Sequence, residues 1–450
     1  MSSFDFGYGD IDGDDADARG RIEDLVRAYE QNADDFFDSH ALEAIASHYY
    51  DLDRFEDALG AIDRLIAEHP HAADAWMRRG ILLSHLDRNA EALAAHDQAL
   101  DLNPYDVEAH VNRGIALDQL SRTDEALAAY ETALALDPVC EDALFNRGVA
   151  LERAERLDDA IDAFERCARV ADDHPEVHYE IGYCLDRLGR DEESLVAYDR
   201  HLDLDPYSAD AWYNKGIVLN RLGRFAEALS AYDFALAIQD DFGSAHYNRG
   251  NTLANTSDFA GAIAAYERVL ELEGPEPTTY YNLGLAYEET RQYEAAREQF
   301  GRALLLDERY AEAWYGAGCC HDALEQAAEA LACFERAVEC APEVAEFWYA
   351  RADALYAAGR VGEALDAYRT VVRMDPDNGD GWLDLADTLF EAGDHASAFE
   401  AYREAHTVAP DAARVYLREA KALYAVGDRE ASIRSVQTAF QLDPTERERG

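Results

Sequence analysis

The chain has 450 residues, 48% of them hydrophobic, and is long enough to bury an extensive core. Its formal net charge of −53 argues against duplex nucleic acid and anionic membranes as partners, because like charges repel. No run approaches the ~18 apolar residues of a membrane span. Seven scattered cysteines and no signal-peptide pattern indicate reduced thiols, so we expect a cytoplasmic protein that does not insert into membranes.

The acidity comes from 93 Asp and Glu residues against 40 Lys and Arg, of which only Lys215 and Lys421 are lysines. One interpretation is a bias of the whole proteome, as in a salt-adapted or GC-rich organism, since surface acidity supports solubility without defining a site. The other interpretation is selection for basic partners. The composition leaves both open.

The N-terminal region precedes the regular part of the chain. Residues 1–17 (MSSFDFGYGDIDGDDAD) are acidic and glycine-rich, which predicts a disordered tail. Residues 18–38 are predicted to form an N-terminal capping helix, because Ile22, Leu25 and Tyr29 recur at helical spacing.

From residue 39 to residue 446 the sequence repeats with a period of 34 residues, which gives twelve units with positions 1 to 34, followed by a C-terminal tail at 447–450. A small residue recurs at position 8, an aromatic residue or histidine at position 4, and a proline at position 32. The small residues are Ala46, Gly80, Gly114, Gly148, Gly182, Gly216, Gly250, Gly284, Gly318, Ala352, Ala386 and Ala420. The position-4 residues include Trp76, His110, His178, Trp212, His246, Tyr280, Trp314, Trp348, Trp382 and Tyr416.

Each unit is predicted to be a helical hairpin. Residues 209–222 and 226–238 have helical periodicity, and Gly223 between them is a plausible helix stop. One hairpin cannot bury both of its faces, so stacking of neighbours is required. The second helices carry aromatic side chains that we expect to fill the gap to the next hairpin. They include Tyr198, Tyr232, Tyr266 and Phe300.

This pattern resembles the tetratricopeptide repeat family over residues 39–446. The resemblance implies an all-α fold, an α-solenoid that forms a superhelix of about twelve 34-residue hairpins, with a concave groove lined by the first helices. The sequence departs from the family pattern in four units, where the closing proline is replaced. The replacements are Asp172, Asp240, Gly274 and Glu308.

Positions 2, 5, 6, 9, 12 and 13 of the first helix share one side and are predicted to face a ligand. Asparagine recurs at position 6 although it is a mediocre helix former, and its amide can pair with the backbone of an extended peptide. Three further asparagines lie on the same side in units six and seven. The position-6 residues are Asn112, Asn146, Asn214, Asn248 and Asn282, and the further ones are Asn220, Asn251 and Asn255.

The position-6 series also resembles the asparagine ladder with which the repeat region of O-GlcNAc transferases holds peptides. Only the ladder carries over, because the chain has no room for a transferase catalytic domain. The alternative is that these asparagines are inherited from an ancestral repeat and merely cover solvent-facing surface.

Tyrosine at position 5 offers apolar contact and a hydroxyl to a ligand, although aromatic residues at helical spacing also serve as packing. The candidates are Tyr213, Tyr247, Tyr281 and Tyr315. Position 2 is mostly acidic, which disfavours the carboxylate clamp of co-chaperone members of the family and favours a neutral or basic segment.

We find no catalytic motif, and we expect no cofactor and no metal. Beside the cluster Cys319-Cys320-His321 stand Cys333 and Cys340, but Cys320 and Cys340 occupy ordinary core positions of the repeat. The acidic run from Asp10 lacks the glycine and glutamate of a calcium loop. The predicted function is a non-catalytic scaffold for a protein or peptide partner. The alternative is an accessory subunit of a separate enzyme or assembly, of glycosyltransferase or secretion type, that uses the convex face or the C-terminal end. Self-association would also use that end.

Overall fold

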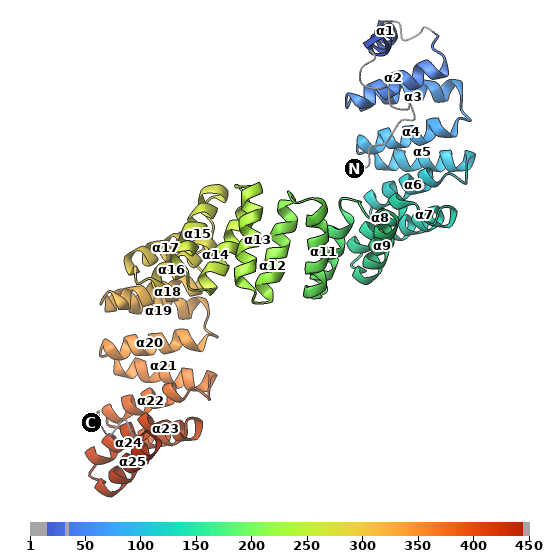
Figure 1. The fold of residues 1–450 in the computed structure, drawn as a ribbon. Coiled ribbons are helices and arrows are strands. Elements are labelled where there is room, and N and C mark those ends of the chain that lie inside the picture. The colour runs from blue at the N-terminus through green and yellow to red at the C-terminus, as the bar shows by residue number, and fades with distance from the viewer. Residues whose placement is uncertain (1–15, 32–35, 444–450) are drawn as a thin grey trace. The chain divides into compact units, whose positions relative to one another are not determined.

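The computed structural model describes residues 16–31 and 36–443, and these residues form 25 α-helices and no β-strand (Figure 1). The predicted all-α class is therefore confirmed. The predicted disordered tail up to residue 15 and the predicted C-terminal tail, residues 447–450, lie outside the described residues. Residues 16–17, which the composition assigned to the tail, already belong to the first helix.

The chain divides into two compact units, Met1–Arg224 and Phe225–Gly450. Unit 1 contains α1 (Ala16–Gln31), α2 (Ser39–Asp51), α3 (Phe55–Glu68), α4 (Ala73–His85), α5 (Asn89–Leu102), α6 (Val107–Gln119), α7 (Thr123–Leu136), α8 (Glu141–Arg153), α9 (Leu157–Val170), α10 (Val177–Arg187), α11 (Asp191–Leu204) and α12 (Ala209–Arg221).

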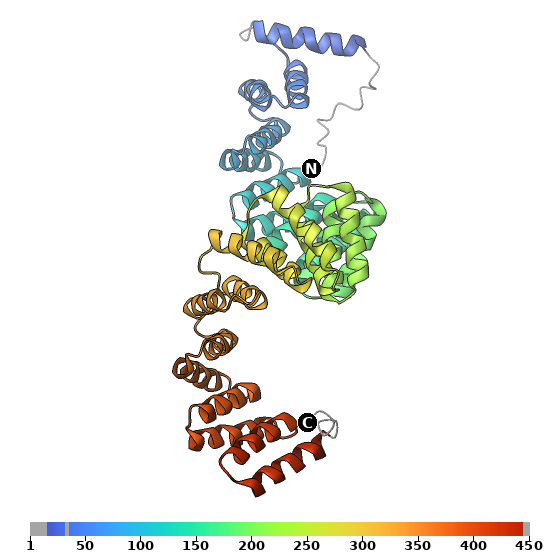
Figure 2. The same cartoon turned by 90° about the vertical axis from the view of Figure 1, so that its left-hand side faces the viewer.

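Unit 2 contains α13 (Phe225–Ile238), α14 (Gly243–Asn255), α15 (Phe259–Glu273), α16 (Pro277–Glu289), α17 (Tyr293–Leu306), α18 (Ala311–Ala323), α19 (Ala327–Cys340), α20 (Ala345–Ala357), α21 (Val361–Met374), α22 (Gly379–Glu391), α23 (His395–Val408), α24 (Ala413–Ala425) and α25 (Arg429–Leu442). Within each unit the helix pairs follow one another as a stack, which Figures 1 and 2 show from two directions.

Most contacts within each unit join helices that are neighbours in the sequence, and others join successive first helices, as a solenoid requires. The 34-residue period is confirmed by twelve first helices, eleven of which begin at position 1 of their repeat. The exception is α10, which begins two residues late at Val177. There His174 Nδ1 accepts a hydrogen bond from the Glu176 N–H at 3.2 Å and holds the preceding segment in a turn. No described helix is long and apolar enough to span a bilayer.

A helix precedes the first repeat as predicted: α1 covers residues 18–31 of the predicted segment 18–38, and residues 32–35 lie outside the described residues. α1 packs against α2 and buries Val26. The residues just before α2 are not helical, because Asp38 is its N-cap and accepts a hydrogen bond from the Ala41 N–H at 2.8 Å.

Every first helix ends at position 13 and is followed by a left-handed residue at position 15. Gly223 has φ +72°, which confirms the predicted helix stop. In seven repeats a residue other than glycine adopts this conformation, with φ between 56° and 64°. The next N–H returns to the carbonyl five residues earlier, as from Arg224 to Leu219 at 2.9 Å, so backbone hydrogen bonds close each turn without glycine.

The small residue at position 8 lies directly under the aromatic ring of its own second helix. A Cβ added to Gly284 would stand 2.7 Å from Phe300 Cε1, and a Cβ on Gly114 would stand 2.4 Å from Tyr130 Cε1. The expectation that these rings fill the gap to the next hairpin was therefore incomplete. The Phe300 ring packs on the small residue of its own hairpin and also fills the gap to the next one, since a Cβ on Gly316 of the next hairpin would lie 2.6 Å from Phe300 Cζ.

Where position 4 is tryptophan or, in two repeats, histidine, its ring nitrogen links the hairpin to the preceding turn. Trp212 Nε1 donates to the Pro206 carbonyl, six residues earlier, at 3.0 Å. His110 and His246 place Nε2 at 3.0 and 3.1 Å from the equivalent carbonyls. Histidine can therefore replace tryptophan at this position because both rings carry an N–H donor.

A second link between hairpins is an ion pair from position 7. A basic side chain there meets an aspartate sixteen residues earlier, on the second helix of the preceding hairpin. The pairs are Arg79–Asp63 at 2.7 Å, Arg113–Asp97 at 2.6 Å, Lys215–Asp199 at 2.5 Å and Arg249–Asp233 at 2.7 Å.

Gly284→Ala is expected to lower the free energy of unfolding by about 1–3 kcal/mol, because the added methyl overlaps the Phe300 ring. Gly301→Ala in the same hairpin is the matched control. Nothing lies within 4 Å of a Cβ there, so this helical alanine should stabilise by about 0.5–1 kcal/mol. Urea unfolding followed by circular dichroism measures both, and effects of the same sign would contradict the packing argument.

Candidate peptide-binding face

The side chains at positions 2, 5, 6, 9, 12 and 13 of the first helices form a surface that we call the first-helix face. All twelve predicted site residues lie on it, and they are divided between the two units. Unit 1 holds Asn112, Asn146, Tyr213, Asn214 and Asn220, and unit 2 holds Tyr247, Asn248, Asn251, Asn255, Tyr281, Asn282 and Tyr315.

Two of the predicted asparagines are held by a tyrosine of the preceding repeat. Asn214 Nδ2 donates to Tyr179 Oη at 3.0 Å, and Asn282 Nδ2 donates to Tyr247 Oη at 2.8 Å. We call this contact, from position 6 to position 5 of the repeat before, the tyrosine–asparagine bridge. A side-chain amide has two N–H donors and one carbonyl, so the bridge fixes the amide and leaves it one donor and the carbonyl for a ligand.

Asn112 and Asn146 lack this bridge, because the preceding repeats carry Met77 and Val111 at position 5. Asn146 instead donates from Nδ2 to the Asp142 carbonyl of its own helix at 2.8 Å. Asn112 is only 6% exposed, and its Nδ2 has no hydrogen-bond partner in the structure. The members of the predicted ladder are therefore not equivalent.

The asparagines of repeats six and seven also differ among themselves. Asn251 Oδ1 accepts a hydrogen bond from Tyr266 Oη at 2.8 Å, so this amide supports a core ring. Asn255 is exposed at the end of α14, whereas Asn220 and Asn248 are half-buried. Of the four, Asn255 is the most open to solvent.

The tyrosines Tyr247 and Tyr281 use their rings for packing. Their ring centroids lie 6.0 and 5.8 Å from those of Tyr266 and Phe300, on the second helices of the same hairpins. A ligand would therefore meet ring edges and hydroxyl groups more than ring faces.

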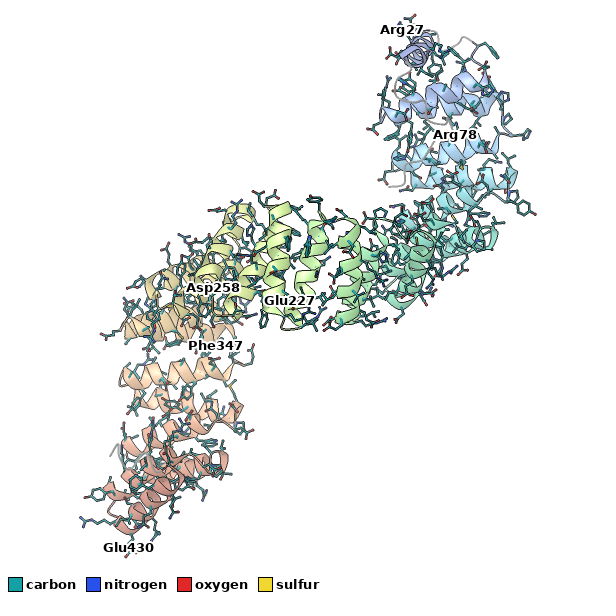
Figure 3. All side chains as sticks on the ribbon, in the orientation of Figure 1. Arg27, Arg78, Glu227, Asp258, Phe347 and Glu430 are labelled. Atoms are coloured by element: carbon teal, nitrogen blue, oxygen red, sulfur yellow. The ribbon has the colours of Figure 1, made fainter. Side chains whose placement is uncertain are left out.

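Tyr315 packs toward the next repeat. Its ring centroid lies 5.1 Å from that of Phe347, which is buried in α20 (Figure 3). Its hydroxyl donates to Glu346 Oε1 at 3.0 Å. Tyr213 is half-buried on α12. Packing and hydrogen bonding between repeats thus account for much of the tyrosine series.

Sequence analysis missed Glu180, which occupies position 6 of the fifth repeat, between the positions of Asn146 and Asn214. This carboxyl is half-buried. Burial raises its pKa to about 7, and the nearby carboxylates of Glu152 and Glu176 add to the shift. The asparagine series is therefore interrupted by a group that titrates near neutral pH.

A row of ion pairs between repeats was also missed. In repeats four to six an arginine at position 13 pairs with an acidic residue at position 12 of the preceding repeat. The pairs are Arg153 with Asp118, Arg187 with Glu152 and Arg221 with Asp186. The sequence does contain a signal for these pairs, because residues of opposite charge stand 35 residues apart in three successive repeats. A comparison of equivalent positions at the 34-residue period does not detect it.

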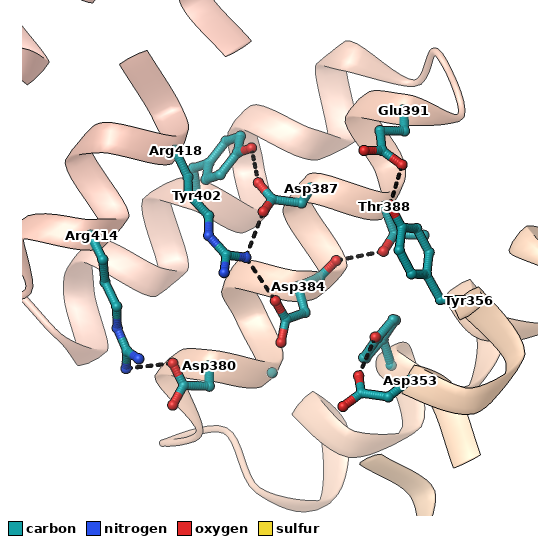
Figure 4. Close-up of polar contacts among 12 residues, drawn as sticks. Asp353, Tyr356, Asp380, Asp384, Asp387, Thr388, Glu391, Tyr402, Arg414 and Arg418 are labelled. Carbon is teal, nitrogen blue, oxygen red and sulfur yellow. Dashed lines mark hydrogen bonds and ion pairs between the residues drawn. The ribbon is translucent and has the colours of Figure 1, made fainter. Parts of the chain in front are cut away.

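Repeats eleven and twelve place a guanidinium among carboxylates on the first-helix face of unit 2. Arg418 Nη1 lies 2.9 Å from Asp384 Oδ1 and 2.6 Å from Asp387 Oδ2 (Figure 4). The hydroxyl groups of Tyr349 and Tyr402 donate to Asp384 and Asp387, respectively. The two carboxylates are thereby fixed on both sides of the arginine.

One turn earlier in the same repeats, Arg414 pairs with Asp380. In the tenth repeat, by contrast, Asp353 accepts a hydrogen bond from Tyr368 Oη at 2.5 Å. Burial raises the pKa of Asp353, and the nearby charge of Asp384 acts in the same direction. This carboxyl therefore keeps its proton to a higher pH than an exposed aspartate does.

Among the described residues, no group of three or more His, Cys, Asp or Glu side chains is arranged to hold a metal ion. The cysteine cluster serves packing instead, because Cys320 and Cys333 are buried and His321 Nδ1 lies 2.7 Å from Gln326 Oε1.

Two hollows in unit 1 lie on the other side of the first helices, between successive second helices. The larger has a volume of about 790 Å³ and lies between α9 and α11, with α10 as its floor. The smaller, of about 530 Å³, lies between α5 and α7 over α6. We call this side the second-helix face.

Tyr247→Phe is expected to lower the free energy of unfolding by about 1 kcal/mol, because it removes the acceptor of the Asn282 amide. A double-mutant cycle with Asn282→Ala should show a coupling of about 0.5–1.5 kcal/mol. Tyr281→Phe is the control, since its hydroxyl has no hydrogen bond in the described structure. Zero coupling would show that the bridge does not stabilise the fold.

Glu180→Gln should change the pH dependence of stability. A carboxyl whose pKa rises on folding stabilises the fold below its unfolded pKa, near 4.5, and loses that effect as pH rises to about 7. The glutamine variant should therefore flatten the decline between these values and be more stable at pH 8, by on the order of 2–3 kcal/mol. Thermal melts from pH 4 to pH 8 measure this, and parallel profiles would contradict it.

A family model described as tetratricopeptide repeat matches the chain in nine segments, most of which overlap. They cover residues 43–107, 111–173, 158–209, 197–243, 213–277, 247–308, 281–345, 315–378 and 349–413. Among curated proteins, no match to the chain is found.

Parts of the chain are similar to solved structures. YrrB, described as a TPR protein with an unusual peptide-binding site, is 27% identical with a TM-score of 0.37, over 41% of this chain and 95% of YrrB. MamA from Desulfovibrio magneticus RS-1 is 23% identical with a TM-score of 0.36, over 37% of this chain and 94% of MamA. The C-terminal part of a repeat protein from Cytophaga hutchinsonii is 19% identical with a TM-score of 0.47, over 53% of this chain and 97% of that one.

The family match extends over most of the chain, from residue 43 to residue 413, and agrees with the helix pairs and their period. The chain therefore belongs to the tetratricopeptide repeat family, whose members are scaffolds for protein–protein interaction.

Proposed function

We propose that this protein is a non-catalytic scaffold whose first-helix face binds an extended, neutral or basic segment of another protein. The asparagine amides hold the backbone of the segment, and tyrosine hydroxyl groups and carboxylates contact its side chains. The interaction is reversible binding without a covalent step.

The tyrosine–asparagine bridge is the observation that carries this proposal. Asn214 and Asn282 are each fixed by one hydrogen bond and retain one N–H and the carbonyl, the pair of groups that matches the C=O and N–H of a peptide backbone. Side chains that are fixed before binding lose less conformational entropy when the ligand arrives. Within unit 2, with repeats spaced by about 10 Å and a strand rising ~3.3 Å per residue, the amides of Asn248 and Asn282 would meet ligand residues about three apart.

The preference for a basic segment is supported by the carboxylates of unit 2. Asp384 and Asp387 hold the Arg418 guanidinium at 2.9 and 2.6 Å, so this face accommodates that group. The net charge of −53 also raises the rate of encounter with cationic partners at low salt.

Photo-crosslinking tests the binding face. A benzophenone amino acid replaces Tyr281 on the first-helix face in one variant and Tyr105, which is 78% exposed at a turn between repeats, in the other. Partners should crosslink from position 281 and not from position 105. Equal yields from both positions would overturn the assignment of the face.

A second experiment separates binding from folding. Asn214→Ala with Asn282→Ala removes two amides and should weaken binding of the captured partner by about fivefold per site. From the sequence alone, unchanged melting would be expected, but the bridges predict a loss of about 1 kcal/mol per site. Tyr179→Phe with Tyr247→Phe is the matched control, since it removes the same bridges and keeps the amides. An equal loss of affinity in both variants would show that the asparagines act only through the fold.

The alternative, an accessory subunit that uses the last hairpin, is favoured by a separate observation. Tyr424, Val426 and Ile433 are 63%, 44% and 57% exposed there. A complex of fixed stoichiometry, or self-association seen by light scattering, that is lost in Tyr424→Ser with Ile433→Glu would support this function. Retention of the complex would exclude that surface.

A further inference from the structure

The larger hollow on the second-helix face differs from its neighbours at one position. In the four ion-paired repeats, position 7 carries Arg79, Arg113, Lys215 or Arg249. The fifth repeat has Ile181 at this position, and the residue sixteen before it is Glu165. The fifth repeat therefore has the acidic residue of this ion pair, Glu165, but an isoleucine in place of the basic residue.

The smaller hollow shows what the basic side chain does where it is present. Arg113 lines that hollow and pairs with Asp97, which also lines it. Its alkyl stem covers apolar surface while its charged end reaches the carboxylate. Where isoleucine replaces the arginine, the hollow is larger, at about 790 Å³ against about 530 Å³.

The floor of the larger hollow is apolar. Ile181 and Leu185 line it from α10 and are 8% and 4% exposed, and Val196 of α11, which is 54% exposed, stands at its side. Such a floor suits an alkyl stem but leaves a buried charge unpaired unless a carboxylate lies within reach.

Two carboxylates at the rim come from α9 and from the turn that follows it. Glu165 has only a distant ion pair, to Arg169 at 3.7 Å with both side chains more than half exposed. Asp172 replaces the usual closing proline and has no ion pair among the described residues. Of the remaining carboxylates that line the hollow, Glu193 is matched by Arg190 at 2.6 Å, and Glu192 has an ion pair to Arg224 at 3.5 Å, only slightly shorter than that of Glu165.

The groups opposite these carboxylates are one guanidinium and one imidazole. Arg200 of α11 lines the hollow, and so does His178 of α10. Burial lowers the pKa of His178, and the Arg200 charge acts in the same direction, so the imidazole is neutral at physiological pH. Because Glu193 and Glu192 pair with Arg190 and Arg224 outside the lining, the other charged groups that line the hollow are Glu165 and Asp172 against Arg169 and Arg200.

We propose that this hollow binds an arginine side chain presented by a partner protein. The alkyl stem lies on Ile181 and Leu185, and the guanidinium pairs with Glu165 and Asp172. The partner thus supplies the basic side chain that the chain itself supplies in neighbouring repeats. Arginine fits better than lysine, because its planar group can bond two carboxylates at once.

The inference is independent of the proposed function. The hollow lies on the second-helix face of repeats four and five, whereas Asn214 and Asn282 lie on the first-helix face of repeats six and eight. Loss of the asparagine amides should therefore leave arginine binding at the hollow unchanged, and the two proposals fail separately.

The test uses the full chain with labelled Ile, Leu and Val methyl groups and the probe acetyl-Leu-Arg-Leu-amide. The same peptide with citrulline, which keeps the shape and removes the charge, is the reference ligand. We expect the methyl resonances of Ile181 and Val196 to shift with the arginine peptide at millimolar concentration and at low salt, and the citrulline peptide to bind at least about fivefold more weakly.

Ile181→Arg restores the residue type of the neighbouring repeats and should abolish binding while the melting temperature stays equal or rises. Ile433→Arg, at a position 57% exposed on α25, is the matched control and should keep binding. If Ile181→Arg fails to fold, Glu165→Gln replaces it. That substitution, at an exposed position, should weaken binding of the arginine peptide about fivefold and leave binding of the citrulline peptide unchanged.

Three results would overturn the proposal. The first is no shift at Ile181 with either peptide. The second is equal affinity for arginine and citrulline. The third is unchanged binding of the arginine peptide in Glu165→Gln.

Discussion

The close contact between a small residue on the first helix and an aromatic ring on the second is the constraint on which the rest of the structure depends. A Cβ at Gly114 or Gly284 would stand under 3 Å from its ring, so the two helices approach to a distance that only a small residue allows. Because this contact recurs in many repeats, the hairpins have similar shapes. Stacking of hairpins within a unit brings position 5 of one repeat next to position 6 of the following repeat, as for Tyr179 with Asn214 and Tyr247 with Asn282.

That juxtaposition gives the asparagine series a double role. Where position 5 is tyrosine, as before Asn214 and Asn282, the amide is fixed by a hydroxyl group. Where position 5 is aliphatic, as before Asn112, the amide nitrogen is left without a partner. One residue type at one position therefore has different consequences, because its neighbour lies 35 residues away and not in the same repeat.

On both faces, ion pairs also depend on contacts between successive repeats. The chain is strongly acidic, yet many of its carboxylates face a basic side chain at a fixed repeat distance, such as Asp384 with Arg418 or Asp97 with Arg113. The places where the expected base is absent are the informative ones. Glu165 opposite Ile181 and the half-buried Glu180 are acidic groups that the regular pattern leaves incompletely matched.

The sequence by itself determined the helix pairs, their period and the residues that could reach the first-helix face, because these depend on local periodicity and on the identity of small and aromatic residues. It did not reveal the left-handed turn at residues such as Glu325, since backbone hydrogen bonds hold that conformation without glycine. Only the tertiary structure decided which asparagines are bridged, that Glu180 titrates near neutral pH and where a hollow opens. These properties depend on burial and on contacts between repeats, which a single-repeat pattern does not contain.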